Sequence, residues 1–192
     1  LKQAGNRVIT ILAARSADLI ILYDKFKATS DEVIVMTDDG SLGKKGLVTA
    51  GIEDIVAYEK IDKCITIGPA VMMKFVALTT KKYNIPTDAS LNTIMVDGTG
   101  MCGACRVTVD GKIRFVCVDG PEFDAHLVDF DEVLTRLRSY QLEEKTAYEA
   151  YHNHTKTPSI QVVEQKKHSI IEDSSSINCQ LTNPEWRKEL RA

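Results

Sequence analysis

Long apolar runs, basic blocks and internal repeats are all missing from this sequence. No apolar run reaches the roughly 18 residues of a membrane-spanning helix, so we predict no membrane segment. Lys and Arg form no block and do not interleave with aromatic residues, and the net charge is −3, so we expect no nucleic-acid partner. No nucleophilic triad or dyad and no paired carboxylates stand out, and we assign no catalytic residue.

A signal peptide and an even set of cysteines are missing too. The chain begins at Leu1 rather than Met, and residues 1–5 resemble the last turn of a helix that Gly5 ends, so we interpret the chain as a fragment. Three of the five cysteines crowd into sixteen positions. A small secreted chain would use them in disulfides. We predict a cytoplasmic chain, in which clustered cysteines favour metal or redox chemistry.

Residues 1–88 contain a regular alternation of strand and helix patterns. Each of three apolar runs of strand length is followed by a helical periodicity. The expected strands are residues 7–13, 32–36 and 63–67, and the expected helices are residues 18–27, 47–60 and 70–83. This alternation predicts an α/β fold whose first part is a truncated, doubly wound parallel-sheet nucleotide-binding domain.

After residue 88 the pattern changes. Residues 89–150 combine glycines, cysteines and short strands with an amphipathic helix expected over residues 131–149. Residues 151–192 are polar, and we interpret them as a linker or tail that could lead to a further domain. Within that tail, residues 169–176 are predicted as a poorly ordered linker and residues 184–190 as a short helix.

The cysteines surround a predicted β-hairpin. Asp110-Gly111 is a strong two-residue turn signal between two β-rich segments. Folding at this turn pairs Val109 with Lys112, and further along it pairs Cys105 with Val116 and Ala104 with Cys117. Cys117 therefore lies beside Cys105. Cys102 lies one tight turn before Cys105, so three sulfur atoms converge in one module.

Asp97 is the candidate for a fourth ligand. It precedes Cys102 by five residues, giving the spacing D-x4-C-x2-C-x11-C. With cysteine in the first place, this would be close to the C-x4-C-x2-C…C run of plant-type [2Fe–2S] proteins. The residues alone also allow a zinc site with Asp97 as an oxygen ligand, inert buried thiols, or a simple turn role for Asp97.

These segments resemble a known family. DGTGMCGAC from Asp97 to Cys105, followed by CVDGPEF from Cys117, is similar to the cluster module of ferredoxin–NADP reductase-like electron-transfer subunits. One similar group is the small subunit of NADH-dependent ferredoxin:NADP oxidoreductase, in which aspartate is a known ligand variant. The other is the electron-transfer subunit of dihydroorotate dehydrogenase, which usually has four cysteines. The resemblance covers about residues 1–150, and Asp97 favours the first group.

The resemblance also implies a nucleotide site at the ends of the strands. Its elements are an A-R-S step near the ribose, a glycine-rich turn after the next strand and a G-P-x-x-M-M element beside the nicotinamide. The residues implied are Arg15, Ser16, Thr37, Asp38, Asp39, Gly40, Ser41, Gly68, Pro69 and Met72. Each group follows the carboxyl end of a predicted parallel strand, where ligands of such sheets bind.

By resemblance, the expected function is electron transfer between NAD(H) or NADP(H), FAD and a [2Fe–2S] cluster, with a larger partner subunit or fused domain. FAD contacts would come mostly from an N-terminal domain outside this chain. The alternatives are a dihydroorotate dehydrogenase subunit and a zinc-stabilised binding module without redox activity. Of the remaining candidates, Cys64 is interpreted as a core residue, and no role is assigned to Cys179.

Overall fold

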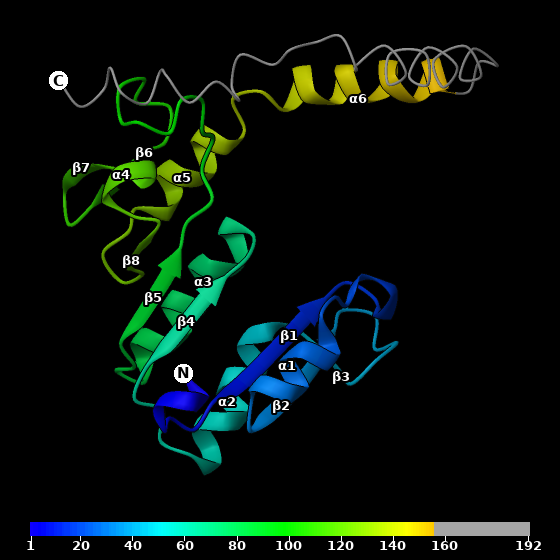
Figure 1. Cartoon of the computed structure of the whole chain (residues 1–192), viewed down its shortest axis with the longest axis vertical. Helices are drawn as coiled ribbons and strands as arrows, with labels where there is room; N and C mark the ends of the chain where they lie inside the picture. The colour runs from blue at the N-terminus through cyan, green and yellow to red at the C-terminus, as the bar shows by residue number, and fades with distance from the viewer. Residues whose placement is uncertain (156–192) are drawn as a thin grey trace, which may run out of the picture. The chain divides into compact units, whose positions relative to one another are not determined.

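The computed structural model describes residues 1–155. Cys179, the predicted linker over residues 169–176 and the predicted helix over residues 184–190 lie outside that range. Residues 1–139 form one compact unit, and a second unit begins at Tyr140 (Figure 1). Within residues 1–155, no helix is both long and apolar enough to cross a membrane.

Parallel strands form from the apolar segments, and the predicted α/β fold class is confirmed. β1 (Ile9–Ala14) pairs in parallel with β2 (Glu32–Thr37), which also pairs with the short β3 (Lys44–Lys45). β4 (Cys64–Ile67) pairs in parallel with β5 (Thr87–Ser90). The predicted strands agree with β1, β2 and β4 apart from their end residues.

β5 and its antiparallel neighbour β8 (Glu122–Asp124) have no apolar run that could have predicted them. Thr87 and Ala89 are buried because β5 lies between β4 and β8, a position that depends on distant segments. β5 includes residue 88, where the sequence pattern changes. The division into residues 1–88 and 89–150 therefore stays a proposal.

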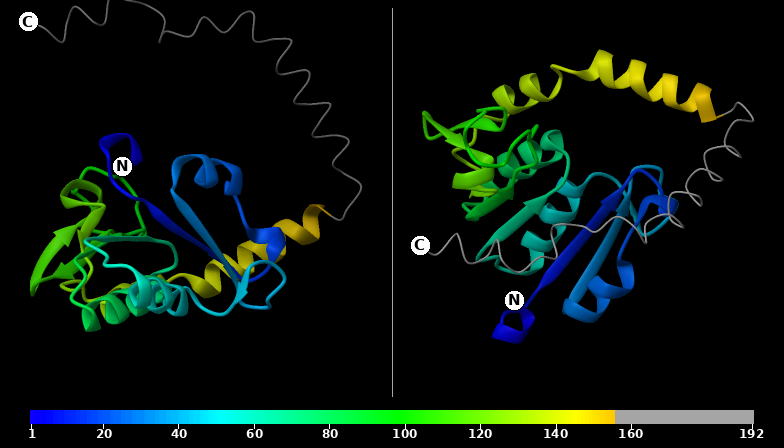
Figure 2. Two further views of the ribbon diagram at one scale, coloured as in Figure 1. Left: turned by 90° about the horizontal axis from the view of Figure 1, so that it is seen from below. Right: turned by 45° about the horizontal axis from the view of Figure 1, so that its top comes forward.

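Six strands form two separate three-stranded sheets, in the orders β1-β2-β3 and β4-β5-β8. Figure 2 shows β1 beside β2 (blue) and β4 beside β5 (cyan to green). In the described part of the chain, β1 and β4 each pair with a neighbour on one side only. Ile65 and Ile67 of β4 are 50% and 72% exposed. β4 is as apolar as a strand that is buried on both faces, but no segment within residues 1–155 covers these two side chains.

Three helices connect the parallel strands. They are α1 (Tyr23–Thr29), α2 (Val48–Tyr58) and α3 (Ala70–Lys82), and α2 packs against α3. The helix predicted over residues 18–27 is wrong in its first half. A 3-10 turn covers Ala17–Leu19, and α1 begins only after Leu22, whose φ is +57°. A left-handed residue cannot continue a right-handed helix, so the two pieces are separate.

The cysteine segment folds as the predicted hairpin. β6 (Arg106–Val109) and β7 (Lys112–Phe115) pair antiparallel, with Val109 opposite Lys112. Asp110 and Gly111 both have positive φ, as a two-residue hairpin turn of this type requires. The short α4 (Val116–Asp119) follows, and α5 (Phe130–Leu137) packs against β6 and α3.

One core joins the hairpin to α3 and α5. Met73 and Ala77 from α3 pack in the same buried cluster as Val107, Val116 and Val133. Because this cluster includes Cys105, the position of a candidate ligand is set by the main core of the unit.

The single helix predicted over residues 131–149 is wrong. α5 ends at Leu137, and a separate α6 covers Gln141–Thr155. The residues of α5 that pack on the core end at Leu137, whereas Tyr140 is exposed. The apolar stripe that suggested one long helix therefore stops where the core stops.

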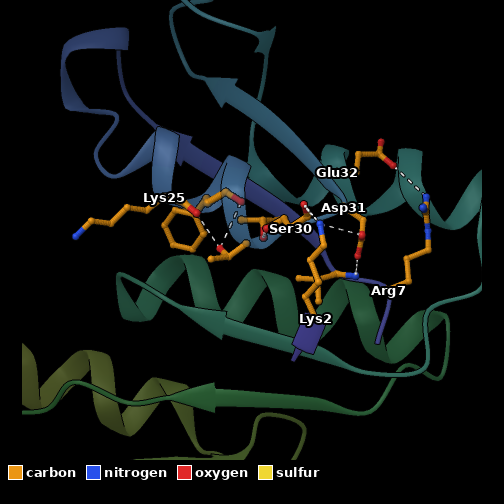
Figure 3. Close-up of polar contacts among 10 residues, drawn as sticks. Lys2, Arg7, Lys25, Ser30, Asp31 and Glu32 are labelled. Carbon is orange, nitrogen blue, oxygen red and sulfur yellow. Dashed lines mark hydrogen bonds and ion pairs between the residues drawn. The ribbon is translucent and has the colours of Figure 1, made fainter. Parts of the chain in front are cut away.

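Polar contacts hold the beginning of β1 (Figure 3). The ammonium group of Lys2 lies 3.1 Å from the Asp31 carboxylate and donates to the carbonyl of Ser30 at 2.9 Å. Arg7 pairs with Glu32 at 3.3 Å. The hydrogen bond from the N–H of Val8 is the largest cause of a lowered pKa of Asp31, and the hydrogen bond from Lys2 is the second. The charged side chains of these ion pairs are partly exposed, so each pair contributes little to stability.

Met73→Ala tests the shared core. Met73 has no exposed surface, so its removal leaves a cavity and should destabilise the chain by about 2–5 kcal/mol in urea unfolding followed by circular dichroism. Val71→Ala, on the same helix but 48% exposed, should change the free energy of unfolding by less than about 0.5 kcal/mol. Equal losses in the two variants would contradict the assignment of the core.

Candidate metal centre

Cys105 and Cys117 are neighbours because of the hairpin. Their sulfur atoms lie 3.2 Å apart, and the N–H of Val116 donates to the carbonyl of Cys105. Cys105 is buried in the core, and Cys117 is half-buried in α4. We expected the ladder to continue until Ala104 paired with Cys117. It ends at Phe115 instead, because the chain turns into α4, and that turn places Cys117 beside Cys105.

Cys102 lies on the exposed loop before the hairpin. Its sulfur accepts a hydrogen bond from the N–H of Ala104 at 3.4 Å. Gly103 between them has a φ of +65°, a conformation that a side chain would strain, so glycine permits the bend. In residues 1–155, no contact joins the sulfur of Cys102 to the other two.

Asp97 closes this loop. Its carboxylate accepts the N–H of Thr99 at 2.8 Å and the N–H of Cys102 at 3.0 Å. The hydrogen bond from Thr99 is the largest cause of a lowered pKa of Asp97, and the bond from Cys102 lowers it further. The side chain is therefore ionised at neutral pH. Asp97 therefore has the turn role considered above, and the same bonds hold its carboxylate at the backbone of Cys102.

The surroundings of the thiols differ. The neighbouring Cys105 thiol raises the pKa of Cys117, whereas the N–H of Gly100 acts in the opposite direction. A raised pKa means that the Cys117 thiol resists ionisation until a cation binds beside it. For Cys64, burial raises the pKa to about 11, which fits an unreactive core thiol.

The candidate donors lie in two contacting pairs, Cys105 with Cys117 and Asp97 with Cys102. Within residues 1–155, no three His, Cys, Asp or Glu side chains are placed to hold a single metal ion. A [2Fe–2S] cluster needs ligands in pairs, two for each iron. Two thiolates on one tetrahedral ion at roughly 2.3 Å lie about 3.8 Å apart, so a small separation of Cys105 and Cys117 would suit one iron.

The predicted nucleotide residues after β1 and β2 come together. The N–H of Ala17 donates to the Ser41 hydroxyl at 2.8 Å, and that hydroxyl donates to Asp39 at 2.6 Å. The N–H of Asp39 donates to the carbonyl of Arg15. Thr37 holds the turn through its hydroxyl, which donates to the carbonyl of Leu42. The first two predicted groups thus form one connected surface at the ends of parallel strands.

The third predicted group stands apart. Gly68 and Pro69 follow β4, and Met72 lies in the first turn of α3. Gly68 has a φ of +157°, a backbone conformation that residues with a side chain rarely adopt, so glycine is favoured there. In the described residues, no hydrogen bond links this group to the loops after β1 and β2. The structure brings together two of the three groups.

Sequence reasoning missed the side chains of α5 that contact the hairpin. Glu132 accepts the N–H of Thr108 at 2.9 Å, and Arg136 donates to the carbonyl of Ala104 at 2.9 Å. Helical periodicity indicated the helix, but it does not show which polar residues turn toward a loop more than twenty positions away.

Comparison with known proteins identifies the cysteine module as an iron–sulfur cluster binding domain. Residues 92–129 match the family described as the iron–sulfur cluster binding domain of dihydroorotate dehydrogenase B. The match covers all four predicted ligands and favours iron–sulfur chemistry over zinc.

Longer relatives match most of the chain. A dihydroorotate dehydrogenase B electron transfer subunit homolog from Thermotoga maritima is 52% identical over 79% of this chain and 53% of its own length. A probable subunit of the same kind from Methanocaldococcus jannaschii is 40% identical over 62% of this chain and 45% of its own. A solved structure of NADH-dependent reduced ferredoxin–NADP oxidoreductase, described in terms of flavin-based electron bifurcation, matches with a TM-score of 0.71 and 51% identity, covering 79% of this chain and 54% of that one.

The two sheets with parallel strands have the architecture of the ferredoxin reductase-like class of proteins. The cysteine hairpin belongs to an iron–sulfur cluster-binding domain. Within that class, the chain is a homologue of the electron-transfer subunits of the dihydroorotate dehydrogenase B family. It spans about half the length of the relatives it matches.

Acid should loosen the loop after β2. The hydroxyl and N–H of Ser41 lower the pKa of Asp39 below its ordinary value of 3.8. The stabilisation from this lowered pKa is complete above pH 3.8, the ordinary pKa of the group. It is lost as the pH falls through the lowered pKa of Asp39 in the folded chain. Hydrogen exchange, corrected for intrinsic rates, should show the Ser41 amide protected at pH 7 and exposed in strong acid.

Two variants check the assignment to Asp39. Asp39→Ala should remove the protection of the Ser41 amide at every pH, because the acceptor is gone. Asp38→Asn, at the adjacent exposed carboxylate, should leave both the protection and its pH dependence unchanged. A pH dependence that persists without Asp39 would rule out this carboxylate as its source.

Proposed function

We propose that the chain is part of an electron-transfer subunit of an iron–sulfur flavoprotein oxidoreductase. The observation that carries this proposal is the contact of Cys105 with Cys117 in a module whose core also contains α3, the helix that follows a candidate nucleotide loop. The cluster ligands and that loop are thus parts of one packed unit, as transfer between a nicotinamide and a metal centre requires.

The proposed centre is a [2Fe–2S] cluster held by four side chains. Cys105 and Cys117, whose sulfur atoms already touch, would share one iron. Asp97 and Cys102, joined through carboxylate and N–H, would share the other. An aspartate is a harder donor than a thiolate, so the two irons would be chemically different.

The loops at the strand ends are proposed to bind NAD(H) or NADP(H). Arg15, Ser16 and residues 37–41 would contact the adenosine side, whereas Gly68, Pro69 and Met72 would contact the nicotinamide side. Arg15 is exposed and has no carboxylate partner among the described residues, so it is available for a phosphate. Whether it selects a 2′-phosphate decides between the two dinucleotides.

When bound, FAD accepts a hydride from the nicotinamide and passes single electrons to the cluster, and we propose that residues outside this chain hold most of it. The electrons then go to a larger partner subunit or a fused domain. We also propose a cytoplasmic location and a linker role for the tail over residues 151–192, of which residues 151–155 are the end of α6.

A dihydroorotate dehydrogenase subunit is the second candidate, favoured by the description of the cluster-domain family. The two candidates share the cluster and differ in the partner. Asp97 in place of a fourth cysteine favours the ferredoxin–NADP type. Two assays of the complete protein distinguish them: reduction of orotate by NADH, and reduction of NADP by NADH together with reduced ferredoxin.

Removing any of the three module cysteines should abolish the cluster. The chain, reconstituted with iron and sulfide without oxygen, should be red-brown, contain about two irons and give an EPR signal after reduction. Cys102→Ala, Cys105→Ala and Cys117→Ala should each lose the visible absorbance.

Cys64→Ala provides the matched control, because Cys64 is a half-buried thiol of β4 outside the module. It should bind iron as the unchanged chain does. A colourless chain that contains one zinc, or full iron content in all three module variants, would overturn the proposal.

Asp97→Cys tests the fourth ligand separately. Thiolate replaces carboxylate, so the cluster should be retained with changed visible bands and a changed reduction potential. Asp97→Ala should bind less iron, because both the ligand and the bonds that close the loop are lost. Spectra and potential that stay the same in Asp97→Cys would exclude Asp97 as a ligand.

A further inference from the structure

α5 touches the cysteine module at two points, one helical turn apart. Glu132 accepts the N–H of Thr108 in β6 at 2.9 Å. Arg136 donates from Nη2 to the carbonyl of Ala104 at 2.9 Å, and Ala104 lies between Cys102 and Cys105. Residues at i and i+4 share one face of a helix, so α5 presents both side chains to the module.

The helix that carries these side chains is firmly placed. Phe130 and Val133 are buried in the shared core. Asp129 caps the helix by accepting the N–H of Glu132, and the N–H of Asp129 itself donates to the carbonyl of Thr108. The Arg136 side chain is thus held at the loop by a rigid element.

The charge of Arg136 is not neutralised by a carboxylate. In residues 1–155, no acidic oxygen lies within ion-pair distance of its guanidinium, although Glu132 lies one turn earlier and binds Thr108 instead. Arg136 is half-buried, so its charge is less screened than that of a fully exposed residue. The nearest polar partner of this cation is the backbone between two candidate ligands.

Both backbone polar groups of Ala104 form hydrogen bonds. Its N–H donates to the sulfur of Cys102, and its carbonyl accepts from Arg136. The carbonyl and N–H of a trans peptide point in opposite directions, so a carbonyl held toward α5 directs the N–H of Cys105 away from α5. Arg136 therefore controls the orientation of the backbone that joins Cys102 to Cys105.

We propose that Arg136 is a positioning residue for the cluster loop and that its charge raises the reduction potential of the bound centre. This inference rests on the proposed function, in which the loop holds a [2Fe–2S] cluster. Reduction adds one electron, supplied by reduced flavin, and breaks no bond. Arg136 stabilises the extra negative charge, because opposite charges attract most strongly where solvent screening is reduced.

The test is an anaerobic redox titration of the reconstituted chain, followed by EPR with dithionite as reductant. Arg136→Gln should favour the oxidised cluster by roughly threefold to tenfold, where tenfold corresponds to about 59 mV for a one-electron couple. Arg136→Lys keeps the charge without the fork of donors, so its potential should lie between those of the unchanged chain and Arg136→Gln.

Arg138→Gln is the matched control. Arg138 lies two residues further along, is exposed and carries the same charge, but within residues 1–155 its side chain forms no hydrogen bond or ion pair. Its removal should leave the potential unchanged. Iron content and the urea midpoint, measured on every variant, separate an effect on the loop from a loss of folding.

The outcomes distinguish this inference from the proposed function. No cluster in the unchanged chain would overturn the proposed function. A normal cluster with an unchanged potential in Arg136→Gln would overturn the inference alone. Loss of iron in Arg136→Gln with an unchanged urea midpoint would support the positioning role, whereas loss of iron with a lower midpoint would reduce Arg136 to a structural residue and overturn the inference.

Discussion

The register of the β6–β7 hairpin is the constraint on which the metal centre depends. With Asp110 and Gly111 in the turn, Arg106 lies opposite Phe115, and the next residues outward are Cys105 and Val116. A one-residue slip would move Cys105 from the core to the opposite face and separate it from Cys117. The burial of Val107 and Cys105 on the same face holds the register, so the packing of apolar side chains also places the ligands.

α3 and α5 extend this constraint to the rest of the unit. α3 begins at the candidate nicotinamide loop after β4, and its buried face packs in the core that contains Cys105. α5 closes the other side of the core and reaches the cysteine loop through polar side chains. The candidate nucleotide loop and the cysteine loop are thus connected through close-packed side chains, which transmit position far better than flexible loops do.

Local features could be predicted from the sequence. The hairpin turn, its register and strands β1, β2 and β4 follow from turn chemistry and apolar patterning within short windows. β5 and β8 could not be predicted, because their short polar sequences are buried only through distant neighbours. The split of residues 131–149 into two helices was also missed, since the apolar stripe shows amphipathicity but not where the core ends.

The sequence by itself determined the candidate donors and their order along the chain, because candidate ligands linked by tight turns and one hairpin require only local contacts. The tertiary structure decided how those donors are supported. It paired Cys105 with Cys117 through α4, tied Asp97 to the backbone of Cys102, and brought Arg136 to Ala104 from thirty-two residues away. Contacts of that span depend on the angle at which a helix packs on a core, and that angle is set by many residues together.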